Sequence, residues 1–272
     1  MPLSVNTNIA SLTAQRSLSS SQSTLETAFE RLSTGKRVNS AADDAAGLAI
    51  GQTLTSKVNG LNQAIRNAND GISVVQIAEG ALDEVTSILQ RMRDLAVQAA
   101  NDSLSSTERG YLDSEQSKLA DALDDVAGAA KFGSTALLTG TFLSKSFQVG
   151  ADSGDTLSIS IDTVTAAQLA VTSGDVDLSN SAADAITDID TALGSVAGFR
   201  ATLGAIQSQL ESTVRNLANV SENTAAARGR ILDTDYAAET ANLTKAQILQ
   251  QASTAILAQA NAQPQSVLAL LQ

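Results

Sequence analysis

The stretch LTSKVNGLNQAIRNANDGISVVQIAEGALDEVTSILQRMRDLAVQA, residues 54–99, carries the strongest structural pattern in this chain. Two rows of apolar residues run through it at intervals of seven: Leu54, Leu61, Ala68, Val75, Leu82, Leu89 and Ala96 form one, and Ala78, Val85, Met92 and Ala99 the other. Residues seven apart share one face of an α-helix, so this spacing predicts a single long helix with a coiled-coil seam. At about 1.5 Å per residue the helix extends roughly 70 Å and needs partner helices of similar length.

A second long helix with the same spacing supplies such a partner. Ser181 and Asp184 fit a capping box, the pair of side chains that satisfies the first free N–H groups of a helix. Two apolar rows follow at intervals of seven: Ile189, Val196, Leu203, Leu210 and Leu217, and Ala192, Phe199, Ile206, Thr213 and Val220. We therefore expect two long antiparallel helices packed along their seams.

Both ends of the chain are also predicted to be helical. Residues 3–34 have a narrow apolar stripe among Ser and Gln, and Gly35 is placed to end that helix. A terminal helix follows Ile231, and Pro264 is expected to break it because proline has no backbone N–H. The C-terminal helix mirrors the one at the start of the chain.

Capping boxes predict two further helix starts. Ser40 with Asp43 is expected to open the first long helix, and Ser105 with Glu108 a helix of about 25 residues. Glycines inside the first long helix are expected to mark close contacts with other elements, because glycine otherwise weakens a helix. These glycines are Gly47, Gly51, Gly60, Gly71 and Gly80.

One β-hairpin is predicted near residues 145–161. Apolar and polar residues alternate there with period two, on either side of the turn-rich segment Gly150–Asp155. Residues 162–181 have no clear period and are interpreted as a short surface loop. The predicted fold class is mainly α: long antiparallel helices forming a coiled-coil-like rod, one small β-hairpin, and paired N- and C-terminal helices.

Composition excludes several kinds of chemistry. The 272 residues include no Cys and no His, and only 3% are aromatic, which removes disulfides and thiolate or imidazole metal ligands. The net charge of −12 is concentrated in residues 43–228, which carry eleven basic and twenty-four acidic side chains. Such an acidic middle argues against nucleic acid and anionic membranes as partners. No apolar run is long enough to insert in a membrane, and no cleaved secretory signal is visible at the N-terminus.

The carboxylates do not form a recognisable catalytic or metal site. Asp124 and Asp125 are neighbours on a helix and point about 100° apart, so they cannot face one substrate together. Asp152, Asp155 and Asp162 lack the spacing of a calcium loop and are interpreted as turn residues. We predict no enzyme, no cofactor and no metal site.

Several segments together resemble the bacterial flagellins: SVNTNIASLTAQRSL (4–18), RLSTGKRVNSAADDAAGLAI (31–50), RNANDGIS (66–73), LQRMRDLAVQAAN (89–101) and AQILQQASTAILAQANAQPQSVLALL (246–271). The resemblance covers residues 4–140 and 183–272 approximately, and FQVGADSGDTLSISI (147–161) is similar to the hairpin of that family. It implies a subunit that polymerises into the helical flagellar filament. Only residues 162–181 are available where many flagellins carry large outer domains, so this is expected to be a short form.

The resemblance implies a division of the chain and a set of partners. Residues 1–42 and 231–272 would form the inner helical pair of the filament, and residues 43–230 the surrounding rod domain. The implied partners are further copies of the chain, a flagellar export chaperone, and the cap and hook-associated proteins. The implied location is the extracellular flagellum, reached through type III export without a cleaved signal peptide.

Two alternatives stay open at this point. A hook–filament junction protein of the same apparatus shares similar terminal helices. A sugar-binding or hydrolytic surface protein on the same scaffold is the other, although the lack of His, Cys and aromatic clusters counts against it.

The resemblance also marks candidate site residues. LQRMRDLAVQ is similar to the flagellin segment recognised by Toll-like receptor 5, which places Arg91 and Leu95 at the main contact positions. Lys118 falls where such flagellins carry a contacting Glu, a departure that weakens the expectation of receptor binding. Without the resemblance, Arg91 is interpreted as part of a solvated face with local salt bridges. The terminal residues expected to mediate assembly are Leu18, Leu25, Leu32, Leu243, Ile248 and Ile256.

Overall fold

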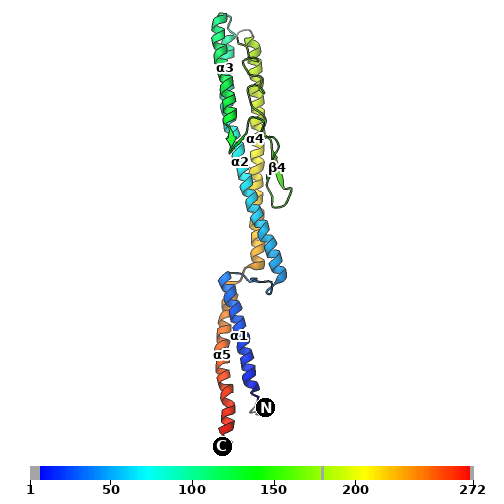
Figure 1. Cartoon of the computed structure of the whole chain (residues 1–272), viewed down its shortest axis with the longest axis vertical. Coiled ribbons are helices and arrows are strands. Elements are labelled where there is room, and N and C mark those ends of the chain that lie inside the picture. Colours follow the sequence, from blue (N-terminus) through cyan, green and yellow to red (C-terminus); the bar gives the residue numbers. More distant parts are fainter. Residues whose placement is uncertain (1–6, 179–180, 270–272) are drawn as a thin grey trace. The chain divides into compact units, whose positions relative to one another are not determined.

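The computed structural model describes the backbone of residues 7–178 and 181–269, with side chains up to residue 262. The described part is mostly helical and contains helices α1 (Ile9–Thr34), α2 (Ala45–Ala99), α3 (Ser106–Ala129), α4 (Ala182–Leu232) and α5 (Tyr236–Ala269) (Figure 1). It divides into two compact units, Met1–Ser56 with Asn223–Gln272, and Lys57–Glu222. The predicted mainly α fold with paired terminal helices is confirmed.

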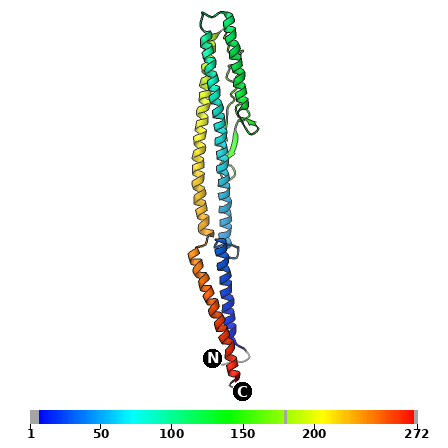
Figure 2. The ribbon, with the colours of Figure 1, turned by 90° about the vertical axis from the view of Figure 1, so that its left-hand side faces the viewer.

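The terminal unit is built on α1 and α5, which lie side by side and antiparallel (Figures 1 and 2). At one end of the pair the Arg31 guanidinium lies 3.8 Å from the Glu239 carboxylate, and at the other the Ser11 hydroxyl donates to the Asn261 side-chain carbonyl at 2.8 Å. α1 ends where the sequence predicts, because Gly35 adopts the left-handed conformation with φ of 70°. The predicted start at residue 3 falls on residues 1–6, which lie outside the described residues.

The seam of the terminal unit consists mainly of small side chains. The most buried residues follow a heptad spacing on each helix, as in a coiled coil. On α1 they are Ser11, Ala14 and Ala28, with Leu18, Ser21, Leu25 and Leu32 half-buried between them. On α5 they are Glu239, Ala246, Ser253 and Ala260. The contact between α1 and α5 therefore buries few large apolar side chains.

The second unit has a conventional apolar core between α2, α3 and α4 (Figures 1 and 2). The predicted rows face inward: Leu82, Leu89 and Met92 of α2 are fully buried, as are Ile189 and Leu210 of α4. Each such side chain contributes about 1.5–3 kcal/mol by leaving water. The heptad rows of the sequence thus identify most of the core of this unit, although Val220, the last residue of its row, is exposed.

Helix starts follow the predicted capping boxes at two of three places. Ser105 and Glu108 form both bonds of the box before α3, and the Ser181 hydroxyl donates to the Asp184 carboxylate at the start of α4. The prediction that α2 starts at Ser40 is wrong. The Asp43 carboxylate instead closes a turn by accepting the N–H groups of Asn39 and Ser40, at 3.1 and 2.9 Å.

The true start of α2 is set by the next carboxylate along the chain. Asp44 accepts the N–H of Gly47 at 2.8 Å, as an N-cap residue does, and α2 begins at Ala45. Of the other glycines predicted to mark close contacts, Gly51 lies against Leu232, Gly60 against Ala151 and Gly71 against Ile159. Gly80 has nothing near its missing side chain, so the prediction was wrong there.

The predicted hairpin is present as β3 (Lys145–Gln148) and β4 (Thr156–Ile159), antiparallel with Phe147 opposite Leu157. A second, smaller hairpin, β1 (Lys131–Phe132) with β2 (Thr135–Ala136), was missed because two-residue strands have no detectable periodicity.

The segment that follows the β3–β4 hairpin has no helix or strand over residues 162–178, but it is not a mere surface loop. It buries several apolar side chains against the core: Val164, Ala166, Leu169, Val171, Val176 and Leu178. Carboxylates of α3 hold both ends, since Asp124 accepts the N–H of Ala166 at 2.7 Å and Asp113 that of Leu178 at 3.3 Å. Asp124 therefore has a structural role here.

The predicted break at Pro264 is wrong, because α5 continues to Ala269. Proline at position 264 lacks the N–H that would bond the carbonyl of residue 260, and its ring crowds the same carbonyl. That carbonyl receives a replacement donor, the Asn8 side-chain amide, at 2.7 Å from Ala260 O. The helix therefore passes the proline without leaving this acceptor empty.

Candidate assembly surface

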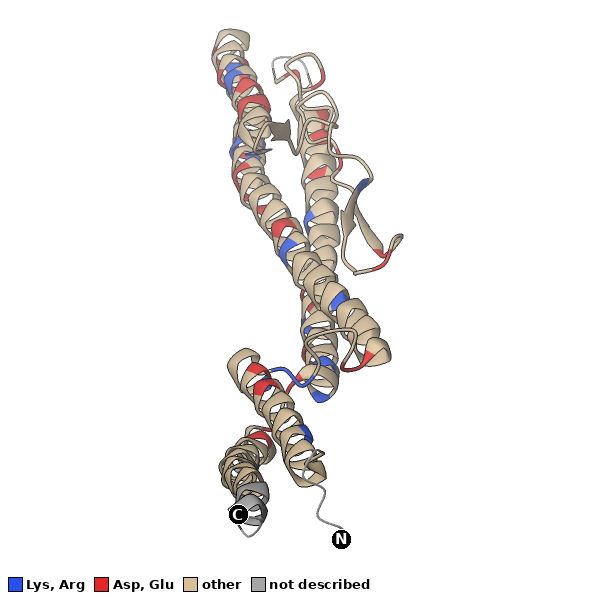
Figure 3. Cartoon of the chain, turned by 60° about the horizontal axis from the view of Figure 1, so that its bottom comes forward, with Lys and Arg blue, Asp and Glu red and all other residues tan. Residues whose placement is uncertain are grey.

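The outer face of the terminal unit carries large apolar side chains in contact with water. They include residues that are between 45% and 69% exposed: Ile9, Leu12, Phe29, Ile248, Leu249 and Ile256. Few charges interrupt this surface, and α1 and α5 are mostly uncharged in Figure 3. Eight of the fourteen large apolar side chains that are exposed among the described residues belong to this unit, which is the smaller of the two. Exposed apolar side chains that lie close together typically mark a surface that another protein covers.

The predicted terminal site residues divide between the seam and this outer face. Leu18, Leu25, Leu32 and Leu243 are half-buried in or beside the α1–α5 seam. Ile248 and Ile256 point outward and are 60% and 59% exposed. The sequence places Ile9, Leu12 and Phe29 on the apolar stripe of residues 3–34, and this prediction is wrong, because the structure leaves all three side chains exposed.

The three residues of the receptor-like segment lie in different environments of the second unit. Leu95 is fully buried in the core, so its side chain is not presented to solvent. Arg91 is exposed and donates to one oxygen of Glu115 on α3, from Nε at 3.1 Å and from Nη2 at 2.5 Å. Lys118, further along α3, pairs with Asp121 at 3.0 Å. Glu115, which the sequence did not single out, is therefore the direct neighbour of Arg91.

Ion pairs also join α2 to α4 along the second unit. Arg93 donates from Nε to Asp190 at 2.6 Å, and Arg200 donates to Asp83 at 3.0 Å. The bond from Arg93 lowers the pKa of Asp190, and the same bond raises the pKa of Arg93. These groups lie in water, where such pairs contribute little to stability, and they favour one alignment of the two helices.

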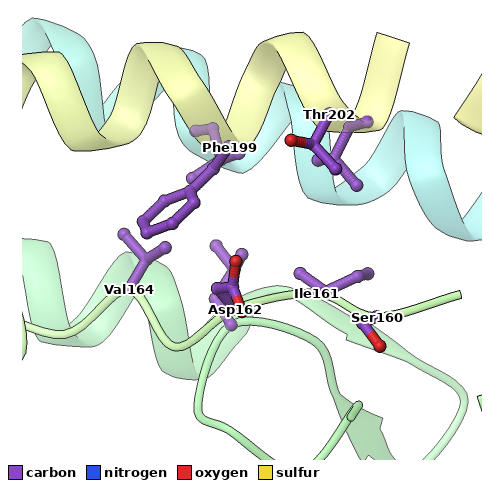
Figure 4. A pocket seen from close by; sticks show the side chains of 9 residues that line it. Ser160, Ile161, Asp162, Val164, Phe199 and Thr202 are labelled. Atoms are coloured by element: carbon purple, nitrogen blue, oxygen red, sulfur yellow. The ribbon is translucent and has the colours of Figure 1, made fainter. Parts of the chain in front are cut away.

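The described part of the second unit contains two hollows that differ in size. One, between α4 and the segment after β4, has a volume of about 10 Å³, which fits at most one water molecule. Figure 4 shows Phe199 and Thr202 facing Val164, Asp162 and Ile161 across it. The other is an open groove of about 310 Å³ between α2 and the β3–β4 turn, lined by Asn67, Gln148 and Asp152 among others.

The described part of the chain offers neither a cluster of metal ligands nor a helix that could span a membrane. No cluster of three or more potential metal-binding side chains occurs among those residues. None of the helices, as far as they are described, is long and apolar enough to cross a membrane.

Comparison with known proteins gives matches along nearly the whole chain. Residues 5–143 match the bacterial flagellin N-terminal helical region, and residues 186–271 match the bacterial flagellin C-terminal helical region. A flagellin of Halalkalibacterium halodurans is 43% identical over 270 residues, covering 98% of this chain and 99% of the relative. Flagellin B of Vibrio cholerae is 38% identical over 375 alignment positions, which cover the whole of both chains. Since 375 exceeds 272 by 103, at least 103 positions of that relative have no counterpart here.

A solved structure shares the fold at lower sequence similarity. The structure of a putative flagellar hook-associated protein from Vibrio parahaemolyticus has a TM-score of 0.58 and 17% identity, covering 70% of this chain and 100% of that one. At this identity the likeness concerns the fold alone, whereas the sequence matches are to flagellins, so neither a junction protein nor a sugar-binding or hydrolytic protein is favoured. The paired terminal helices, the rod-like helices and both family matches place this chain among the bacterial flagellins, the structural subunits of the flagellar filament.

Proposed function

We propose that this flagellin polymerises through the apolar outer face of α1 and α5. The observation that carries the proposal is the distribution of side chains in the terminal unit, which is the reverse of an ordinary core. Ala and Ser are the most buried residues of the seam, while large apolar residues such as Ile248 and Ile256 are exposed to water. Subunits packed around an axis would cover that face. In this arrangement residues 1–42 and 231–272 form the inner helical pair, and residues 43–230 the surrounding rod domain.

The proposal is tested by replacing apolar side chains on the outer face with polar ones that suit a helix. Ile248→Gln combined with Ile256→Gln should abolish or strongly reduce filament formation, scored by electron microscopy after seeding. Thr254→Gln, an exposed polar change on the same helix, is the matched control and should polymerise normally. Filaments of ordinary length and rate from the double variant would refute this assembly surface.

We also propose that Arg91 lies on a surface where subunits pack along the filament. The motive is that Arg91 is exposed and held in a fixed orientation by Glu115. Arg91→Glu should impair polymerisation, but it also places two carboxylates together. The swapped variant, Arg91→Glu with Glu115→Arg, restores the internal ion pair and separates the two effects. If the swapped variant polymerises as well as the parent chain, the surface role of Arg91 is wrong.

Further partners follow from family membership and are proposed on that basis. The chain is exported without a cleaved signal peptide, is bound before export by a chaperone at the apolar terminal helices, and meets the cap and hook-associated proteins at the growing filament. It has no enzymatic activity. Toll-like receptor 5 would have to engage Arg91 and Lys118 without Leu95, so we propose weak or absent recognition, testable by receptor signalling assays with the monomer.

A further inference from the structure

A polar cluster ties the start of α1 to the last described part of the α5 seam. Asn8 uses both ends of its side-chain amide: Oδ1 accepts the N–H of Ser11 at 3.0 Å, and Nδ2 donates to the carbonyl of Ala260 at 2.7 Å. The Ser11 hydroxyl donates to Oδ1 of Asn261 at 2.8 Å. Asn8 thus caps α1 and contacts α5 with one side chain.

The acceptor on α5 is available because of the sequence four residues further on. In an α-helix the carbonyl of Ala260 would bond the N–H of residue 264, and residue 264 is proline, which has none. Asn8 supplies the missing donor. The bond from Asn8 therefore forms at the turn of α5 in which Pro264 leaves a carbonyl without its helical donor.

The seam around this cluster specifies register poorly. Its buried α5 positions recur every seven residues, and three of them, Ala246, Ser253 and Ala260, are similarly small. A slip of one heptad would exchange these three small side chains for one another, so in this part of the seam only polar contacts such as those of Asn8, together with the Arg31–Glu239 pair at the other end, distinguish the two alignments. In coiled coils, register in such cases is set by polar groups with a specific partner.

We propose that Asn8 and Pro264 form a register lock, in which Pro264 is a positioning residue that frees the Ala260 carbonyl for Asn8. A one-heptad slip places Asn8 opposite a carbonyl that already has its helical donor. The correct alignment is therefore the one in which the orphaned donor and the orphaned acceptor meet. The lock concerns the alignment of α1 and α5 within one chain, and it goes beyond the proposal that the outer face drives polymerisation.

Disulfide trapping can measure this alignment directly, because the chain has no cysteine of its own. Ser11→Cys with Asn261→Cys reports the observed register, and Ser11→Cys with Thr254→Cys reports a slip of one heptad. Each reporter chain is polymerised with an excess of the unmodified chain, so that disulfides form within chains, and the two products are quantified by peptide mass spectrometry. If none of the chains polymerised, the result would count against the proposed assembly surface. If filaments form and the ratio of the two disulfides changes, the result bears on the lock.

Asn8→Asp is the informative variant, because aspartate caps a helix as well as asparagine does but cannot donate to Ala260. In filaments the ratio of 11–261 to 11–254 trapping should fall roughly three- to tenfold, the factor expected for one hydrogen bond. In a Pro264→Ala background, residue 264 supplies its own N–H, and Asn8→Asp should have no further effect. An unchanged ratio in Asn8→Asp, or an equal fall in both backgrounds, would overturn the lock. If Pro264→Ala chains do not enter filaments, the comparison of Asn8→Asp with Asn8→Gln decides the same question. Glutamine keeps a side-chain N–H donor, so the ratio of 11–261 to 11–254 trapping should recover in Asn8→Gln and not in Asn8→Asp.

Discussion

Gln116 is a polar residue in an apolar environment. It lies on α3, is 0% exposed, and neither its Nε2 nor its Oε1 has a hydrogen-bond partner among the described residues. A buried amide without partners loses its bonds to water and gains none in return. This burial could not be predicted from the sequence, because a glutamine in a helix is usually an exposed residue.

We therefore expect Gln116→Met to stabilise the second unit. Methionine has nearly the same shape and no polar atoms to satisfy, so the free energy of unfolding should rise by about 1–2 kcal/mol. Urea unfolding followed by circular dichroism measures the change. Gln98→Met on exposed α2 surface is the control and should stay within about 0.5 kcal/mol of the parent. A destabilised Gln116→Met chain would indicate that the amide has a partner, such as an ordered water.

At the scale of helices, the paired seams of α2 and α4 determine the stability of the second unit. Leu89 and Leu210 are both fully buried in this core. Truncating either to Ala removes apolar surface and leaves a cavity, which should cost about 2–5 kcal/mol. Thermal melting of the isolated subunit checks this, with Leu143→Ala at a 52% exposed site as the control. A loss below about 0.5 kcal/mol at both buried sites would contradict the pairing.

The capping box of α3 gives that helix a dependence on pH. The N–H and hydroxyl of Ser105 hydrogen-bond the carboxylate of Glu108 and lower its pKa below the ordinary value. A lowered pKa means that the stabilisation is present above the ordinary carboxyl range and is lost as the pH falls through the folded-state pKa. Ser105→Ala should thus cost about 1 kcal/mol at neutral pH, and clearly less near pH 3. Alanine keeps the backbone N–H of residue 105, so equal losses at both pH values would show that the Ser105 hydroxyl does not stabilise the Glu108 charge.

The limits of sequence-based prediction are clearest at this scale. Heptad rows located α2 and α4 and identified Leu89 and Leu210 as buried, because packing against a long partner leaves a regular trace. Individual hydrogen bonds were harder to predict. The helix α2 starts after Asp44 and not at Ser40, because Asp44 accepts the N–H of Gly47. Asn8 donates to the carbonyl of Ala260, 252 positions away, which Pro264 leaves without its helical donor. The same reasoning marked Ile248 and Ile256 as assembly residues but could not show that they face outward.

For the molecule as a whole, the terminal unit has too little buried apolar surface to be stable alone. Its seam holds small side chains, while ordering each residue costs about 1–2 kcal/mol in backbone entropy. We expect residues 1–40 and 233–272 to be disordered in the monomer and helical in the filament. Limited proteolysis and hydrogen exchange on both states would test this. Protected ends in the monomer would refute coupled folding, and equal exposure in both states would deny these ends an assembly role.

The terminal unit takes its two halves from opposite ends of the polypeptide, since Met1–Ser56 packs with Asn223–Gln272. Asn8 and Ala260 meet across nearly the full length of the chain. A chain whose synthesis stops early, or that loses its last helix to a protease, keeps α1 but has nothing in itself for α1 to pair with. Such a fragment can still fold Lys57–Glu222, yet it cannot complete the unit that we propose for polymerisation. In the polymerisation that we propose, only a chain that carries both of its ends can present the complete assembly surface.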